Sequence, residues 1–147
     1  MHGTDSEIRI SPASTDDLRA AQRFYDTCGY GGAAIQADDF VVLAWKQEAI
    51  IGIGRLCNDA GNLCLRGMQV QAEHRRIGVG SMVLNRLSAQ IGAAACYCLP
   101  YSHLVTFYAR VGFEPVNETL PEVLDHRLRG YLQRGLDITA MLKPAKL

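Results

Sequence analysis

A short loop with two glycines constrains the fold of this sequence more than any other segment. The loop is Arg75-Arg76-Ile77-Gly78-Val79-Gly80. It lies between a run of β-forming residues and a run with helical spacing, and Ser81 is at the start of the expected helix. Glycine lets the backbone approach a ligand closely, and the N-terminus of a helix offers unpaired N–H groups at the positive end of its dipole. The sequence therefore predicts a strand, a pyrophosphate-binding loop and a helix in direct succession.

This loop differs from the two best known nucleotide-binding patterns. The dinucleotide pattern needs three glycines in the order G-x-G-x-x-G, and the nucleoside triphosphate loop needs Gly-Lys followed by Ser or Thr. Neither pattern occurs in the sequence. Dinucleotide and nucleoside triphosphate sites are therefore disfavoured.

The size and charge of the chain limit its partners. Its 147 residues, 48% hydrophobic and 20% charged, suit one globular domain over residues 1–147. Fifteen Lys and Arg residues balance fifteen Asp and Glu residues. A neutral chain creates no global field that attracts nucleic acid or an anionic membrane, so we expect neither partner and a local anion site only.

The apolar runs are too short to cross a bilayer. Phe40–Trp45 and Ala49–Ile53 contain only a few residues each, whereas a spanning helix needs about 20. The opening segment Met1–Ile10 carries Asp5 and Glu7 and lacks the apolar centre of a signal peptide. A cytoplasmic location is therefore expected.

The five cysteines predict neither disulfide bonds nor a metal centre. Their number is odd, and Cys96-Tyr97-Cys98 has one intervening residue where a zinc knuckle has two. We expect them to be small buried side chains.

The first half of the chain has the pattern of a strand, a helix and a three-stranded meander. Ile8–Ile10 alternates like a strand, and Ser14 offers an N-cap for a helix that reaches about Thr27. A glycine-containing loop at Gly29–Gln36 is expected to be mobile. Three β-rich runs then follow, with a turn at Asn58–Asn62 before the third: Phe40–Trp45, Ala49–Leu56 and Leu63–Val70.

The second half alternates helices and strands. Helical spacing over Gly80–Gln90 precedes a short-side-chain strand at Ala94–Leu99 and a helix at Leu104–Arg110. A further helix is predicted over Thr119–Gln133, with Thr119 and Glu122 as a capping box and leucines at positions 120, 124, 128 and 132 forming a stripe to be buried. Ile138–Leu142 completes the pattern as a last strand.

Two motifs resemble those of the GNAT N-acyltransferase superfamily. Val70–Gly80 resembles its acetyl-CoA signature, R/Q-x-x-G-x-G/A after a hydrophobic strand, and Phe107–Glu114 resembles its second signature, an aromatic-Tyr helix that ends in Gly-Phe. The resemblance extends over nearly the whole chain. It implies an α/β (α+β) fold with a mixed, mostly antiparallel central sheet flanked by helices, here with an extra helix before the last strand.

The resemblance implies acetyl-CoA as cosubstrate and indicates which residues bind it. Main-chain groups of Met68, Gln69 and Val70 would pair with the pantetheine arm where this strand splays from its neighbour, as an anion with a strand-like amide arm requires. Backbone amides of the loop would hold the pyrophosphate, and an ordinary strand-to-helix turn is the alternative. The loop residues are Arg75, Arg76, Ile77, Gly78, Val79, Gly80 and Ser81.

Tyr108 matches the tyrosine that lies near the thioester sulfur in this superfamily. A phenol with a pKa of about 10 can donate a proton or hydrogen bond to a leaving thiolate whose reference pKa is about 8.5. Because complete transfer is uphill, assistance within the transition state is the expected role. A tyrosine of the protein core on an amphipathic helix is the alternative.

The acceptor side departs from the superfamily pattern. Tyr101 stands where many members carry Asn, and Ala72 stands where Pro is frequent. An amine of pKa near 10.4 costs about 4.6 kcal/mol to deprotonate at pH 7, so a base must help. His103 is the candidate base, with an ordinary surface histidine as the alternative.

The loop Gly29–Gln36 and the helix Thr119–Gln133 are expected to sense the acceptor. Arg127 and Arg129 give this helix a basic character that suits an anionic group on the acceptor, although a solvated helix face is the alternative. The leucine stripe suggests that the helix either walls the acceptor pocket or contributes to a homodimer contact.

The predicted function is transfer of an acetyl group from acetyl-CoA to a primary amine, with a small molecule as the favoured acceptor because one domain leaves no separate recognition module. Acetylation of protein N-termini or lysines remains open. A non-catalytic module that binds acyl-CoA is the alternative from another class.

Overall fold

The computed structural model describes residues 7–147, so part of the opening segment used to argue against export lies outside the described residues. The described chain divides into two compact units. The N-terminal unit comprises the chain up to Leu56 together with Gly67–Ala89, and the C-terminal unit comprises Cys57–Arg66 with Gln90–Leu147. Within residues 7–147, seven strands form one sheet, which confirms the mixed, mostly antiparallel sheet. Their order in the sheet is β1 (Ile8–Pro12), β2 (Phe40–Lys46), β3 (Ala49–Asp59), β4 (Asn62–Val70), β5 (Cys96–Cys98), β7 (Met141–Lys143) and β6 (Glu114–Pro115).

The N-terminal unit contains the strands and helices that the first half of the sequence predicts. Antiparallel pairing joins β1 to β2 and β2 to β3, with Ile10 opposite Ala44 and Leu43 opposite Ile53. Its elements are β1 (Ile8–Pro12), α1 (Leu18–Cys28), β2 (Phe40–Lys46), most of β3 (Ala49–Asp59), the last part of β4 (Asn62–Val70) and most of α2 (Val79–Ile91).

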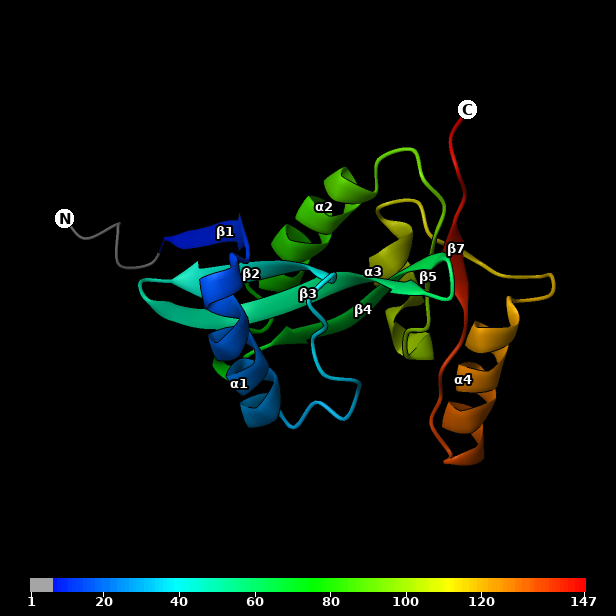
Figure 1. The fold of residues 1–147 in the computed structure, drawn as a ribbon, viewed down its shortest axis with the longest axis horizontal. Coiled ribbons are helices and arrows are strands. Elements are labelled where there is room, and N and C mark those ends of the chain that lie inside the picture. Colours follow the sequence, from blue (N-terminus) through cyan, green and yellow to red (C-terminus); the bar gives the residue numbers. More distant parts are fainter. Residues whose placement is uncertain (1–6) are drawn as a thin grey trace. The chain divides into compact units, whose positions relative to one another are not determined.

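Alternation along β2 and β3 separates two buried faces. Val41, Leu43 and Ile53 form one core cluster with Ala21 and Tyr25 of α1. The residues between them turn to the other face, where β3 carries glycines against α2. Figure 1 shows α1 and α2 on opposite sides of these strands. The strand period of two therefore gives each helix its own face of the sheet.

Two glycines in β3 let α2 pack close to the sheet. A Cβ built at Gly52 would lie 2.8 Å from a γ-methyl group of Val79, and one at Gly54 would lie 2.8 Å from a δ-methyl group of Leu87. Val79 is in the first turn of α2. The absence of side chains at these strand positions therefore fixes where the N-terminus of α2 can lie.

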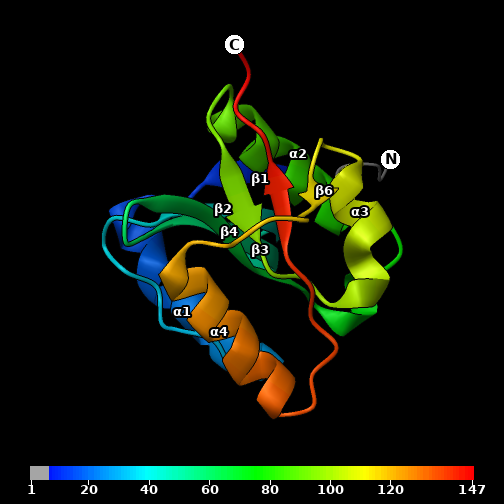
Figure 2. The same ribbon diagram turned by 90° about the vertical axis from the view of Figure 1, so that its right-hand side faces the viewer.

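The C-terminal unit is built around the short strand β5 (Cys96–Cys98). β4 runs parallel to β5, β7 (Met141–Lys143) is antiparallel to β5, and β6 (Glu114–Pro115) is antiparallel to β7. Two helices complete it, α3 (Val105–Ala109) and α4 (Glu122–Gln133). Figure 2 shows them on opposite sides of β7.

The extra helix is present, but the prediction of its first turn is wrong. α4 begins at Glu122 with Pro121 as N-cap, so Thr119 lies outside the helix and forms no capping box. Proline disfavours helical backbone at the residue before it, here Leu120, so a helix that starts at Thr119 would be interrupted at once. The predicted leucine stripe is buried over only part of its length. Leu124 is fully buried, whereas Leu132 is 50% exposed.

The turn between β3 and β4 is tighter than predicted. β3 continues to Asp59 and β4 starts at Asn62, which leaves Ala60 and Gly61 as a two-residue hairpin loop. Both residues have positive φ angles, 52° and 87°, as the turn that matches strand twist requires.

None of the helices within residues 7–147 combines the length and apolar character needed to cross a membrane.

We expect Gly52→Ala to lower the free energy of unfolding by about 1–2 kcal/mol, because the new methyl group overlaps the stiff side chain of Val79. Urea unfolding followed by circular dichroism measures this. Gly31→Ala is the matched control, since its Cβ would meet no atom within 4 Å. Equal stability of the two variants would contradict close packing of α2 on β3.

Candidate active site

The predicted pyrophosphate loop lies at the N-terminus of α2. Arg76 and Gly78 have left-handed φ angles of 68° and 91°. The N–H of Met82 donates to the carbonyl of Gly78 at 3.0 Å, which closes the first helical turn. A Cβ at Gly78 would meet no protein atom within 4 Å, and Ile77 is 57% exposed. The backbone here is open to solvent, so it fits an approaching phosphate group.

The end of β4 provides the strand edge that an amide-containing arm needs. The ladder between β4 and β5 consists of Cys64 opposite Tyr97 and Leu65 opposite Cys98. Within the described chain, the segment 68–70 lies beyond the last pair of that ladder. Arg75 donates from Nε to the carbonyl of Val70 at 3.1 Å, and a carbonyl oxygen has a second lone pair for another donor.

The loop 29–36, which the sequence predicts to be mobile, makes hydrogen bonds to the rest of the N-terminal unit. Its anchor is the buried side chain of Arg55, which pairs with Asp39 at 3.2 Å and donates to the carbonyl of Ala33 at 2.6 Å. The N–H of Ile35 also donates to the side chain of Gln22 at 2.9 Å. A buried guanidinium satisfies several of its donors here, and it therefore holds the loop on the sheet.

Tyr108 lies on α3 and is 6% exposed. Its ring makes edge contacts with Phe107 and Phe113, with centroids 5.0 and 6.0 Å apart. Burial raises the pKa of the Tyr108 phenol above its ordinary value of 10, and proximity to Cys98 adds to this. The hydroxyl therefore stays protonated across the range in which most enzymes work, and it can act as a proton or hydrogen-bond donor.

Tyr101 and His103 lie together after β5. Their rings stack with centroids 5.8 Å apart, and Tyr101 is 45% exposed. Tyr101 forms an isolated bridge with Ile138, and the Ser102 hydroxyl donates to Asp137 at 2.9 Å. These contacts fix an exposed aromatic pair on the C-terminal unit.

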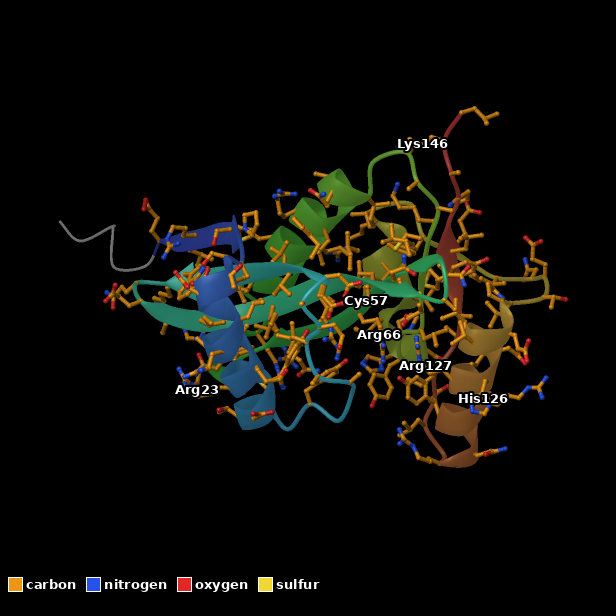
Figure 3. All side chains as sticks on the ribbon, viewed as in Figure 1. Arg23, Cys57, Arg66, His126, Arg127 and Lys146 are labelled. Carbon is orange, nitrogen blue, oxygen red and sulfur yellow. The ribbon has the colours of Figure 1, made fainter. Side chains whose placement is uncertain are left out.

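The structure separates the two predicted acceptor arginines. Arg127 donates to Asp59 at 3.1 Å and is largely buried, and Arg66 approaches the other oxygen of the same carboxylate at 3.7 Å. The two arginines are labelled in Figure 3. Arg129 is 72% exposed and pairs with Asp125 one helical turn away at 2.8 Å. Arg127 thus ties α4 to the β3–β4 hairpin, whereas Arg129 lies in solvent.

An open hollow of about 630 Å³ adjoins the first turns of α4. It has acidic and basic side chains in equal number if the histidine is charged, so it favours neither sign of ligand. The residues that line it are Ala60, Glu122, Val123, Asp125, His126 and Arg129.

Comparison with known proteins identifies the family. The sequence model of the family described as "Acetyltransferase (GNAT) domain" matches residues 37–115, more than half of the chain. The chain belongs to the GNAT acetyltransferase family. No curated protein sequence matches it significantly.

Solved structures share the GNAT fold with this chain at low sequence identity. ElaA from Escherichia coli is 18% identical with a TM-score of 0.67, covering 93% of this chain and 99% of that one. The ribosomal-protein-S18-alanine N-acetyltransferase from Escherichia coli is 16% identical with a TM-score of 0.69, covering 96% of each chain.

One further relative was solved with ligands. N-acetylglutamate synthase from Neisseria gonorrhoeae, complexed with coenzyme A and N-acetyl-glutamate, is 16% identical with a TM-score of 0.66, covering 97% of this chain and 36% of that one. These similarities show a shared fold.

The GNAT sequence motifs fall in different units of the structure. The strand end and loop over residues 68–81 belong to the N-terminal unit, whereas Tyr108, Tyr101, His103, Arg127 and Arg129 belong to the C-terminal unit. Within the C-terminal unit, Tyr101 and His103 are neighbours and the two arginines point to different carboxylates.

Sequence reasoning missed two buried residues beside the expected strand edge. Tyr25 of α1 donates its hydroxyl to the carbonyl of Gly67 at 2.8 Å, and the guanidinium of Arg55 lies 5.3 Å from the centre of the Tyr25 ring. Arg55 lies within an otherwise apolar strand run. This position is the signal in the sequence that could have indicated a buried charge with buried partners.

The cysteines of the GNAT chain are free, and four are buried. Burial raises the pKa of Cys96 to about 12 and also raises that of Cys98 and Cys64. Such thiols are poor nucleophiles. Among the described residues, no group of three or more His, Cys, Asp and Glu side chains is placed to hold a metal ion.

We expect Asp59→Asn to destabilise the protein at pH 7 by about 1–2 kcal/mol, because Arg127 and Arg66 lose their shared anionic partner. Burial alone would raise the pKa of Asp59, but the bond from Arg127 keeps it below its ordinary value of 3.8. A lowered pKa means that this stabilisation is present above pH 4 and is lost as the pH falls through the lower folded value.

Urea unfolding at pH 7 and pH 3 tests this dependence. The difference between wild type and Asp59→Asn should shrink at pH 3. Asp125→Asn is the control, since Asp125 pairs with the exposed Arg129 and should change stability by less than about 0.5 kcal/mol. A pH-independent difference for Asp59→Asn would show that the ion pair is not its cause.

Proposed function

We propose that this GNAT protein is an N-acetyltransferase that moves the acetyl group of acetyl-CoA to a primary amine, with a small molecule as acceptor. The observation that carries the proposal is the open loop at the N-terminus of α2, where a Cβ at Gly78 meets no protein atom. It follows a strand whose last residues lie beyond the β4–β5 ladder. An anionic head and an amide arm need this combination of an open helix N-terminus and a strand end beyond the ladder.

Each group of the chain has a distinct task in the proposal. Backbone N–H groups of the segment 75–81 hold the pyrophosphate, and main-chain groups of Met68 to Val70 align the pantetheine arm. When bound, acetyl-CoA supplies an activated thioester. The neutral phenol of Tyr108 then donates a hydrogen bond to the departing sulfur, because its raised pKa keeps the proton on oxygen until the transition state.

The acceptor amine must reach the site without its extra proton. Deprotonating an amine of pKa near 10.4 at pH 7 costs about 4.6 kcal/mol, which a base or desolvation has to offset. We assign His103 as candidate base and the exposed Tyr101 ring beside it as a contact for the acceptor. Arg129 is the better placed of the two helix arginines to meet an anionic acceptor group, since Arg127 is held by Asp59.

Support for a small acceptor comes from the helices and strands that the described chain forms. Within residues 7–147, α4 is the one helix beyond the pattern of the resemblance, so no separate module for a large partner is present there. The likeness to N-acetylglutamate synthase is compatible with this. We also propose that residues 1–147 form one domain in the cytoplasm, since the solved structures named in this article cover 92–97% of the chain and its cysteines are free.

Another structure with the same fold was solved with a bisubstrate analogue. Naa50 from Arabidopsis thaliana, solved with the bisubstrate analogue CoA-Ac-MVNAL, has a TM-score of 0.60 at 14% identity, covering 92% of this chain and 97% of that one. The acceptor test therefore uses small amines, amino acids and N-terminal peptides, with release of free thiol from acetyl-CoA as readout. Binding of acetyl-CoA without thiol release for any acceptor would favour a non-catalytic module.

We expect Gly78→Glu to abolish acetyl-CoA binding, because a carboxylate would enter the loop that receives the pyrophosphate. Isothermal titration calorimetry measures the affinity. Gly135→Glu is a matched control, since it has a comparable left-handed φ of 79° and an equally open Cβ position on the C-terminal unit. Unchanged affinity in Gly78→Glu would remove the loop from the proposed site.

We expect Tyr108→Phe to lower kcat by roughly 10- to 10,000-fold with nearly unchanged acetyl-CoA affinity, since only the hydroxyl is lost. Steady-state kinetics with the best acceptor measures this. Tyr97→Phe, a half-buried tyrosine of β5, should keep wild-type kcat. A Tyr108→Phe variant with full kcat would assign Tyr108 to the core alone.

A further inference from the structure

The strand end that the proposal assigns to acyl-CoA contains a left-handed residue. Gly67 has a φ angle of 68° inside β4, which marks a local break in the extended strand. A Cβ at this position would overlap the hydroxyl oxygen of Tyr25. Tyr25 lies on α1 and is fully buried. The conformation of β4 at this point is therefore shaped by a side chain 42 positions earlier in the sequence.

The contact between them is a hydrogen bond to the main chain. The Tyr25 hydroxyl donates to the carbonyl oxygen of Gly67 at 2.8 Å. In a planar trans peptide, the carbonyl and the following N–H point in opposite directions. Fixing the Gly67 carbonyl on Tyr25 therefore also fixes the direction of the Met68 N–H, the first main-chain donor of the segment 68–70.

The Tyr25 ring is itself held from two sides. Tyr30 stacks on it with ring centroids 4.4 Å apart, and the Arg55 guanidinium lies 5.3 Å from its centre. Arg55 is 1% exposed and is held by Asp39 and by the carbonyl of Ala33. A hydroxyl on so constrained a ring has little freedom to turn away from Gly67.

We propose that Tyr25 is a positioning residue for the acyl donor. Its hydroxyl holds the Gly67–Met68 peptide in the orientation that presents the strand end 68–70 to the pantetheine arm. The proposal rests on the acetyl-CoA function proposed above. Tyr25 touches neither the donor nor the reacting atoms in this role, and it acts only through the peptide that it holds.

Tyr25→Phe tests the proposal by removing the hydroxyl and keeping the stacked ring. One neutral hydrogen bond contributes about 0.5–1.5 kcal/mol, which corresponds to a 2- to 13-fold change in affinity. We expect acetyl-CoA to bind about 3- to 10-fold more weakly in calorimetry, and KM for acetyl-CoA to rise with a smaller effect on KM for the acceptor. In the complex, hydrogen exchange by NMR should show less protection of the Met68 amide than in wild type.

Tyr30→Phe is the matched control from the same buried cluster. Its hydroxyl accepts from Arg55 at 3.4 Å, whereas the Gly67 carbonyl accepts from Tyr25, so the variant should keep wild-type acetyl-CoA affinity and Met68 protection. Thermal unfolding of both variants checks that the fold is intact. Equal losses in the two variants would mean a general loosening of the cluster and would overturn the positioning role.

The two proposals fail in different ways. If the wild-type chain binds no acetyl-CoA, the proposed function is wrong and the role of Tyr25 falls with it. If wild type binds and Tyr25→Phe binds equally well with unchanged Met68 protection, the function stands and the positioning role is wrong.

Discussion

The buried guanidinium of Arg55 joins segments of the N-terminal unit that are far apart in the sequence. It pairs with Asp39, donates to the carbonyl of Ala33 and lies against the ring of Tyr25. A charge this deeply buried costs free energy unless several groups pair with it at once. Loss of any one partner would leave part of that cost uncompensated. The α1–β2 loop, helix α1 and strand β3 therefore depend on one another through a single side chain.

The opposite face of the same strands depends on the absence of side chains. Gly52 and Gly54 leave room for Val79 and Leu87, so α2 lies closer to β3 than any larger residue would allow. Because Val79 belongs to the first turn, this packing also sets the position of the loop before it. One face of the sheet is thus fixed by a polar cluster and the other by steric fit, and the proposed donor site depends on both.

The parts of the fold that local patterns determine could be predicted, and the parts set by distant pairs could not. Strand alternation and helical spacing predicted most of the elements. The motifs Val70–Gly80 and Phe107–Glu114 carried the GNAT resemblance, which the family comparison confirms. The anchoring of the loop 29–36 depends on Arg55, and the break at Gly67 depends on Tyr25, and no periodic pattern reveals either partner. At α4 two local signals competed, and the one at Pro121 prevailed.

The overlap at Gly67 has a consequence for how such a chain can change over generations. Any side chain at this position meets the Tyr25 hydroxyl and also has to adopt a left-handed backbone. A mutation of the glycine is therefore damaging while the tyrosine is present, whereas loss of the tyrosine hydroxyl relieves part of the crowding. Substitutions at the two positions are therefore expected to occur in a fixed order, with the tyrosine changing before the glycine.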